Sequence, residues 1–256
     1  MNNITSQLPR LYEIEVARGN IAGASFASIT CVNPSVGTSF EDIWDEGGEL
    51  IYPSVAGEWE ILSDNAADTN AGTGVRTIDV TTLDGDYKVQ VTTVTLNGTT
   101  PVSLSGTHLR PRIMISKTAG SSNGNVGGIT LREKSSGNTM LKMRPTLNTT
   151  FSGHFTVPAG KTALVFQTYL TMRKNTDIIL DNQCRFVDNN IFISTGENYS
   201  FQSSFTTANI AKAPIPEKSD LKTRCKSNNT DVSVTAKLDI LLFDEAFTNN
   251  LAQIFF

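Results

Sequence analysis

Hydrophobic and polar residues alternate in short runs over most of the chain. The longest run spans residues 232–243, where an apolar residue stands at every second position. A period of two is the pattern of a β-strand with one buried face. No segment of the sequence keeps a helical period, and turn-forming residues separate the runs at intervals of roughly eight to twelve residues. The pattern therefore predicts an all-β fold with antiparallel sheets.

Two segments refine this prediction. The β-type runs 75–81 and 87–96 are separated by Leu83-Asp84-Gly85-Asp86, whose Asp-Gly pair is a strong signal for a hairpin turn. Residues 164–170 are nearly all apolar, as expected of a strand covered on both faces. The expected architecture is an antiparallel β-sandwich of the jelly-roll type.

The residue pattern along the chain changes near residue 140, which suggests a boundary between two β sub-domains at about 132–146. A Greek-key crossover that joins both halves into one body is an equal alternative. The predicted division is an N-terminal arm with the first strands (1–36), a first sandwich (37–138), a second, jelly-roll-like sandwich (139–246) and a C-terminal tail (247–256).

Composition narrows the classes of partner. Charged residues make up 18% of the chain, below the roughly 25% of average soluble domains, with Thr, Ser, Asn and Gly in their place. A net charge of −4 without a basic field argues against a nucleic-acid partner. No run of eighteen apolar residues is present, so no membrane partner is expected. The basic pair Arg110/Arg112 is interpreted as a solvated face or a contact between subunits.

The three cysteines, Cys31, Cys184 and Cys225, are far apart in the sequence and form no CxxC pair. This usage predicts folding in a reducing compartment. A bridge between Cys184 and Cys225 is conceivable but nothing indicates it. The N-terminal residues lack the basic-then-apolar pattern of a signal peptide, in keeping with folding in a cytoplasm.

No pattern of catalytic residues stands out. The only histidines are His108 and His154, too few for a His-rich metal site. No G-x-S-x-G motif marks a nucleophilic serine. The glycine-rich segments 72–74 and 120–128 are not followed by a helix that would bind a phosphate. The prediction is a protein that is not an enzyme and needs no cofactor or metal.

Two weaker hypotheses remain open. The loop DNAADTNAG at 64–72 places oxygen ligands at spacings like those of a calcium loop, although it lacks the closing Glu of an EF-hand. The aromatic residues Trp44, Tyr52, Trp59 and Tyr87 are candidates for a sugar-stacking platform. The favoured interpretation of these four residues is that they anchor the core or an interface.

The segment 40–104 and its neighbours carry a resemblance. The runs FEDIWDEGG, SDNAADTNAGTGVRTIDVTTLDGDY, VTLNGTTPVSLSG and LRPRIMISKTAGSSNGNVGGITL resemble a family of virion structural proteins of tailed bacteriophages, many from marine phages. The likeness continues more loosely in FTVPAGKTALV and in PIPEKSDLKTR with DVSVTAKLDILLFD. It covers most of residues 37–244, and the segment 172–212 departs from the pattern.

The resemblance implies a virion component made in the cytoplasm of a bacterial host. We expect a capsid decoration (cement) protein at the particle surface, because rigid β surfaces with uncharged polar faces suit symmetric assembly. Its expected partners are the major capsid protein and neighbouring copies of itself, in a trimer. A tail or head–tail connector component and a carbohydrate- or receptor-binding β module are the alternatives. The candidate assembly-interface residues are Trp44, Tyr52, Phe255 and Phe256.

Overall fold

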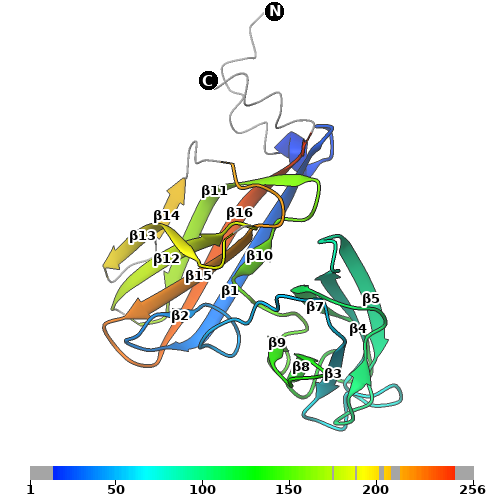
Figure 1. Ribbon diagram of the computed structural model, residues 1–256. Helices are drawn as coiled ribbons and strands as arrows, with labels where there is room; N and C mark the ends of the chain where they lie inside the picture. The colour runs from blue at the N-terminus through cyan, green and yellow to red at the C-terminus, as the bar shows by residue number, and fades with distance from the viewer. Residues whose placement is uncertain (1–13, 175, 188, 202–204, 209–213, 246–256) are drawn as a thin grey trace, which may run out of the picture.

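The computed structural model describes residues 14–174, 176–187, 189–201, 205–208 and 214–245 (Figure 1). It consists almost entirely of antiparallel strands, with a short helical turn at 14–17, so the all-β prediction is confirmed. The candidate residues Phe255 and Phe256 lie outside the described residues. In the part that is described, no helix is long and apolar enough to cross a membrane.

Eight strands form a sandwich of two sheets, ordered β1-β16-β11-β14 and β10-β15-β12-β13. Taken in chain order, the first of these strands pairs with the eighth, the second with the seventh, the third with the sixth and the fourth with the fifth. This nested pairing is the jelly roll, and it confirms the predicted fold. The strands are β1 (Ala24–Val36), β10 (His154–Thr156), β11 (Lys161–Met172), β12 (Asp177–Arg185), β13 (Ile193–Phe201), β14 (Phe205–Ala208), β15 (Asp220–Ser227) and β16 (Val232–Asp244).

The alternation in β16 explains its position at the centre of one sheet. Its even-numbered apolar residues from Val232 to Leu242 all face the main core between the two sheets. On the opposite face Leu241 and Phe243 pack against Val16 of the helical turn, in a smaller cluster that Leu164 and Phe166 of β11 border. The nearly apolar residues 164–170 of β11 therefore have packing partners on both faces of the sheet, as the sequence predicts.

A second β unit is inserted between β1 and β10 and has its own hydrophobic core, which includes Trp59, Ile78 and Met114. Its two sheets are ordered β6-β3-β8-β9 and β5-β4-β7. The hairpin predicted at Asp84-Gly85 joins β4 to β5. The strands are β3 (Trp59–Ser63), β4 (Val75–Leu83), β5 (Val89–Thr95), β6 (Val102–Ser103), β7 (Arg110–Ala119), β8 (Ile129–Glu133) and β9 (Thr139–Met143).

The strand pairing divides the chain differently from the predicted division. Residues 1–36 were expected to stand apart, yet β1 pairs with β16 along most of its length. The short strand β2 (Glu41–Asp42), expected in the first sandwich, pairs with β15 of the jelly roll. The reason is physical: alternation shows which side chains face a core, but it does not show which strands exchange hydrogen bonds.

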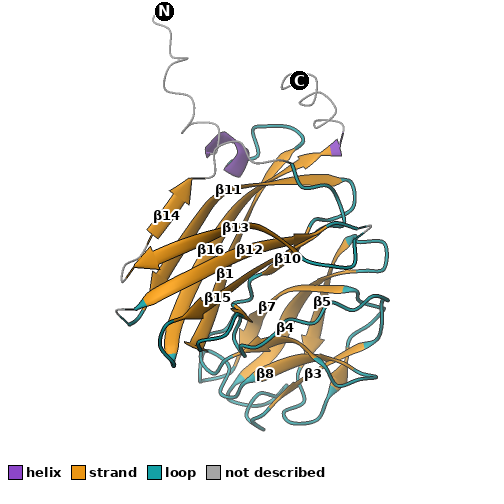
Figure 2. Ribbon diagram, turned by 60° about the vertical axis from the view of Figure 1, so that its left-hand side comes forward, coloured by secondary structure: helices purple, strands orange, loops and turns teal. Residues whose placement is uncertain are grey.

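The inserted unit lies beside β1 and β10, which are the edge strands of the two jelly-roll sheets on the same side (Figures 1 and 2). The described ends of the chain meet at the far end of the jelly roll, where the Asp244 amide donates to the Gly23 carbonyl at 2.8 Å. The contact between the two units, which we call the seam, is thus formed by residues far apart in the sequence.

Candidate functional site

The seam is organised around the carboxylate of Asp220 on β15. Arg110 on β7 of the inserted unit donates to both of its oxygens, Nε to Oδ1 at 2.8 Å and Nη2 to Oδ2 at 3.0 Å. Arg185 on β12 donates from Nε to Oδ2 at 3.1 Å, and Thr156 donates to Oδ1 at 2.7 Å. The side chains of Asp220 and Arg110 are each only 4% exposed. Two arginines from different units therefore clamp one buried acid.

The clamp keeps Asp220 ionised. Burial alone would raise the pKa of this carboxyl, but the hydrogen bonds and charges of Arg110, together with Thr156 and Arg185, outweigh it and lower the pKa. Arg110 also donates to the Pro53 carbonyl. The clamp therefore also fixes the segment that leads from the jelly roll into the inserted unit.

Tyr52 belongs to the seam. Its half-buried ring packs against the Arg110 and Arg185 guanidinium groups, with ring centroid to Cζ distances of 5.6 and 5.0 Å. It also contacts the Phe192 ring at 4.9 Å and the His154 ring at 6.2 Å between centroids. Much of the surface that made Tyr52 an interface candidate is covered within its own chain.

Trp44 is only 4% exposed and so offers little surface to a neighbouring subunit. Trp59 is fully buried in the core of the inserted unit. Tyr87, like Tyr52, lies against the Arg110 guanidinium. The four aromatic residues therefore do not form an exposed platform, and the sugar-stacking hypothesis for them is wrong because two of them fill cores and two pack on one buried arginine.

The histidines have structural roles. The Pro111 carbonyl accepts from Nε2 of His154 at 2.7 Å, so Nδ1 accepts from the Ser152 hydroxyl at 2.6 Å. Burial lowers the pKa of His154 to about 4. A histidine held neutral this strongly is a weak base for activating Ser152. Nδ1 of His108 likewise lies 2.8 Å from the Thr82 hydroxyl, and burial lowers its pKa too.

The buried His154 predicts a pH dependence of stability. Its folded pKa is about 4, whereas an unfolded histidine has a pKa near 6.5. As the pH falls through this interval the unfolded state takes up a proton that the folded state does not. The free energy of unfolding should therefore fall by up to about 3 kcal/mol between pH 6.5 and 4. Urea unfolding at a series of pH values measures this.

The matched variant for this prediction is His154→Gln, which keeps a side-chain donor and acceptor but does not titrate. It should unfold more easily at neutral pH and should show a shallower loss of stability from pH 6.5 to 4. If the variant and the wild type lose the same amount over this interval, His154 is not the group responsible.

The acidic loop at 64–72 is organised around Asp68, which is fully buried. Its Oδ1 accepts from the amides of Val75 and Val126, both at 2.9 Å. Its Oδ2 accepts from the Ser63 hydroxyl at 2.7 Å and the Gly127 amide at 2.8 Å. Both oxygens thus face hydrogen-bond donors, which is not the environment of a calcium ligand. Across the described residues, no group of three or more His, Cys, Asp or Glu could hold a metal ion.

The same carboxylate explains why the two glycine-rich segments are needed. Gly74 lies so close to Asp68 that a Cβ would be 2.1 Å from Oδ1. The Gly120 amide donates to the Gly74 carbonyl at 2.8 Å, so the two segments pack side by side. Gly74 allows the backbone to approach Asp68 closely, and Gly120 allows the two segments to pack, since a Cβ there would lie 2.4 Å from the Gly72 carbonyl oxygen. The role of both glycines is structural.

The three cysteines are unpaired and buried. Burial raises the pKa of Cys31 to about 12 and that of Cys184 to about 11. Thiols in this state are poor nucleophiles, because the thiolate is the reactive form.

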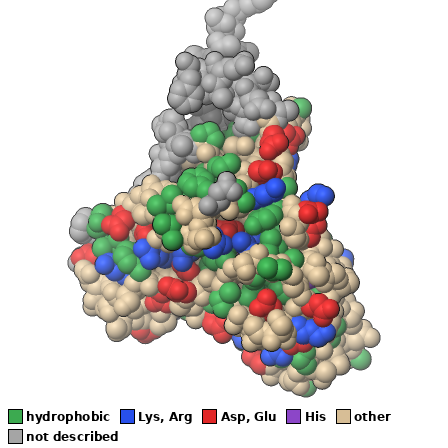
Figure 3. All heavy atoms as spheres, in the orientation of Figure 1, with side chains coloured by type: hydrophobic (Ala, Val, Ile, Leu, Met, Phe, Trp, Pro, Cys, Tyr) green, Lys and Arg blue, Asp and Glu red, His purple; other side chains and the backbone are tan. Residues whose placement is uncertain are grey.

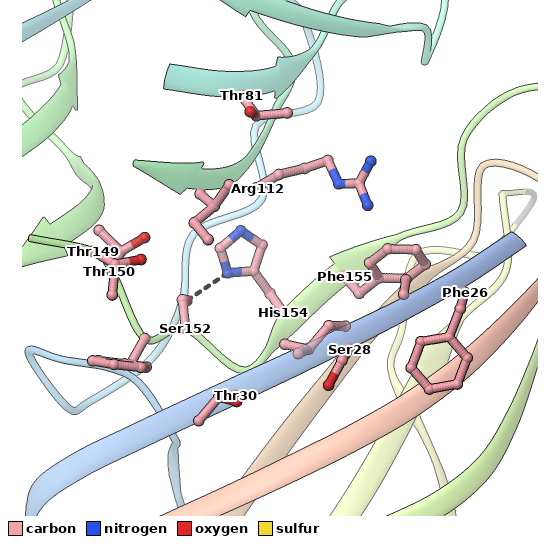
Figure 4. A pocket seen from close by; sticks show the side chains of 14 residues that line it. Phe26, Ser28, Thr30, Thr81, Arg112, Thr149, Thr150, Ser152, His154 and Phe155 are labelled. Carbon is pink, nitrogen blue, oxygen red and sulfur yellow. Dashed lines mark hydrogen bonds between the residues drawn. The ribbon is translucent and has the colours of Figure 1, made fainter. Parts of the chain in front are cut away.

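Next to the clamp, a cavity of about 440 Å³ opens between β1, the inserted unit and the segment that enters β10 (Figure 4). We call it the seam pocket. The pair Arg110/Arg112, expected on a solvated face or at a subunit contact, is divided between these two features: Arg110 is in the clamp and Arg112 lines the pocket. Its lining residues are Phe26–Thr30, Thr81, Arg112, Ile113, Thr149–Ser152, His154 and Phe155.

Comparisons with known proteins add little. No family model matches the chain. No curated protein is similar to it in sequence. Among solved structures, a chain from T=1 particles derived from infectious bursal virus is 10% identical, and the alignment covers 87% of this chain and 74% of that one. Its TM-score of 0.14 is too low to carry any argument about fold or function.

Proposed function

We propose that this chain is a non-enzymatic structural protein of the virion of a tailed bacteriophage. In this proposal it is a capsid decoration protein that forms trimers and binds the major capsid protein, bridging neighbouring shell subunits. The observation that carries the proposal is the jelly-roll strand order of residues 24–244, because viral capsid proteins use this fold repeatedly. The resemblance of residues 37–244 to virion proteins points in the same direction.

The charge distribution supports a role in protein assembly. On the face shown in Figure 3, positive and negative side chains are interspersed among neutral ones. A large area of neutral surface suits contacts between protein subunits, in which charged residues are depleted at the centre.

The outer face of sheet β5-β4-β7 supports the same proposal. Val89 and Val91 of β5 and Ile115 of β7 are exposed there. Threonines occupy neighbouring positions of the same sheet. The ion pair between Lys117 and Asp79 lies on the same face, so the sheet presents a mixed apolar and polar surface of the kind found in protein interfaces.

The buried chemistry supports the non-enzymatic part of the proposal. The clamp holds Asp220, backbone and hydroxyl donors hold Asp68, and both histidines are hydrogen-bonded. A tail or head–tail connector component is the alternative within the virion. A carbohydrate- or receptor-binding module is the second candidate function, because lectins also use jelly rolls and the seam pocket offers a ligand site.

Particles stripped of the protein test the decoration proposal. We expect stripped particles to release their DNA at a lower temperature than complete particles, since contacts between shell subunits have been removed. Adding back the purified protein should restore the original temperature, with an unrelated β protein of similar size as control. Equal heat resistance of stripped and complete particles would contradict a stabilising role.

A further inference from the structure

The seam pocket has two kinds of wall (Figure 4). On the jelly-roll side, Phe26, Ser28 and Thr30 of β1 alternate with residues that turn toward the core. On the side of the inserted unit, Thr81 of β4 and Arg112 of β7 border the cavity. Its volume of about 440 Å³ lies in the range of small-molecule sites. The pocket exists only where the two units meet.

Arg112 is the unusual residue of the pocket. Among the arginines that the structure describes, only Arg112 and Arg173 have a guanidinium without a hydrogen bond or ion pair, and Arg173 is exposed. Arg110, two residues earlier on the same strand, has all of its partners within the chain. Arg112 is thus a half-buried cation without a counter-charge.

The position of the Arg112 guanidinium is well defined. Its Cζ lies 5.1 Å from the centroid of the Phe155 ring, a cation–π contact that orients the group over β10. Burial lowers the pKa of Arg112, in keeping with the loss of water around it. A cation that has lost water without gaining a partner is an attractive site for an anion.

The remaining lining groups do not neutralise Arg112. The pocket lining contains no Asp or Glu, and the buried His154 beside it is held neutral. Nearby Asp239 already accepts from Ser28 and pairs with Lys237.

Several hydroxyl groups in the pocket are available for a ligand. Thr30, Thr81 and Thr149 are half-buried lining residues, and their side chains form no hydrogen bond to another residue in the described part of the chain. The lining of the pocket therefore combines these hydroxyls with the apolar rings of Phe26 and Phe155. Such a lining suits a small ring-shaped ligand that carries several hydroxyl groups.

We propose that the seam pocket binds a small acidic sugar, whose carboxylate pairs with Arg112 and whose hydroxyls bond to the threonines. A planar guanidinium matches the two oxygens of a carboxylate. A phosphate dianion would call for further cationic donors, and Arg112 is the only cationic side chain in the lining. The site goes beyond the proposed role in the virion, since the isolated protein binds the ligand whatever its position on the particle.

Calorimetric titration of the full chain with sodium glucuronate, glucose and sodium sulfate tests the proposal. Glucuronate should bind saturably, and glucose should bind at least about tenfold more weakly because it cannot pair with Arg112. Arg112→Gln should weaken glucuronate binding by about tenfold or more. Arg173→Gln, the same change at an exposed arginine, should leave it unchanged.

A second variant, Thr81→Val, removes one pocket hydroxyl without touching the charge and should weaken glucuronate binding about two- to tenfold. Any of three results would overturn the proposal: no saturable glucuronate binding to the wild type, equal binding of glucose and glucuronate, or full binding by the folded Arg112→Gln variant. Saturable binding of sulfate without glucuronate would identify a simple anion site and would equally overturn it.

Discussion

Replacing Asp220 with asparagine should lower the free energy of unfolding by about 3–5 kcal/mol. The variant keeps the size of the side chain but removes the only negative charge in the clamp. Arg185, whose side chain is 20% exposed, can turn toward water. Arg110, at 4%, cannot, and it is left as a buried cation without a counter-charge. Urea unfolding followed by tryptophan fluorescence measures the loss.

Asp86→Asn is the matched control, because it is the same chemical change in an ion pair whose acid is 77% exposed. Its effect should stay within about 0.5 kcal/mol. If Asp220→Asn costs no more than this control, the clamp does not hold the two units together.

Replacing Asp68 with alanine should be as damaging, with a loss of about 4 kcal/mol or more. The change leaves three backbone amides and one hydroxyl without the acceptor they now share. Each buried donor left without a partner costs about 1–3 kcal/mol. The loops at 64–74 and 120–128 would lose the group around which they pack.

Asp84→Ala provides the comparison for Asp68. Asp84 also accepts from two backbone amides, those of Asp86 and Lys88, but in an exposed turn where water can replace the carboxylate. We expect a loss of about 1 kcal/mol there. Similar losses in the two variants would show that the buried network around Asp68 contributes no more than a surface turn.

The clamp and the seam pocket are linked through strand β7. Arg110 fixes one end of the strand to the jelly roll, and Arg112, two residues further on at the register shift opposite Thr81 and Thr82, lines the pocket. The pairing of Arg110 with Asp220 therefore positions Arg112. Loss of the clamp should also disturb the pocket, which is why the binding experiments use variants that leave Asp220 intact.

The fold class could be predicted because alternation is a local property. Each residue of β16 that was expected to face a core does so, and the Asp84-Gly85 turn joins the strands that it was expected to join. The partner of β1 could not be predicted, because Cys31 lies 205 residues from Ala236, the residue opposite it. Nothing in either segment encodes that pairing locally, so the sequence predicts a first sandwich that also includes residues 37–58, although β2 pairs with β15 of the jelly roll.

The site was harder to predict than the fold. Asp220 lies in a stretch that looks like a polar hinge, and Arg110 is 110 residues away. Their meeting depends on the docking of two units, for which the sequence has no short-range signal. The sequence predicts a calcium ligand at Asp68 because only the spacing of the oxygen-bearing residues is visible in it. The actual partners of Asp68 are mostly backbone amides, which any sequence supplies, so they leave no signal in the sequence. Trp44 matched both a core and an interface residue, and only its burial distinguishes them.

The copy number of this chain in purified phage particles tests the proposed function most directly. Quantitative mass spectrometry against the major capsid protein measures it. A decoration protein should be present on the order of hundreds of copies, set by the symmetry of the shell. A value of about six to twelve copies would instead place the chain at the tail or connector, and its absence from purified particles would contradict a role in the virion.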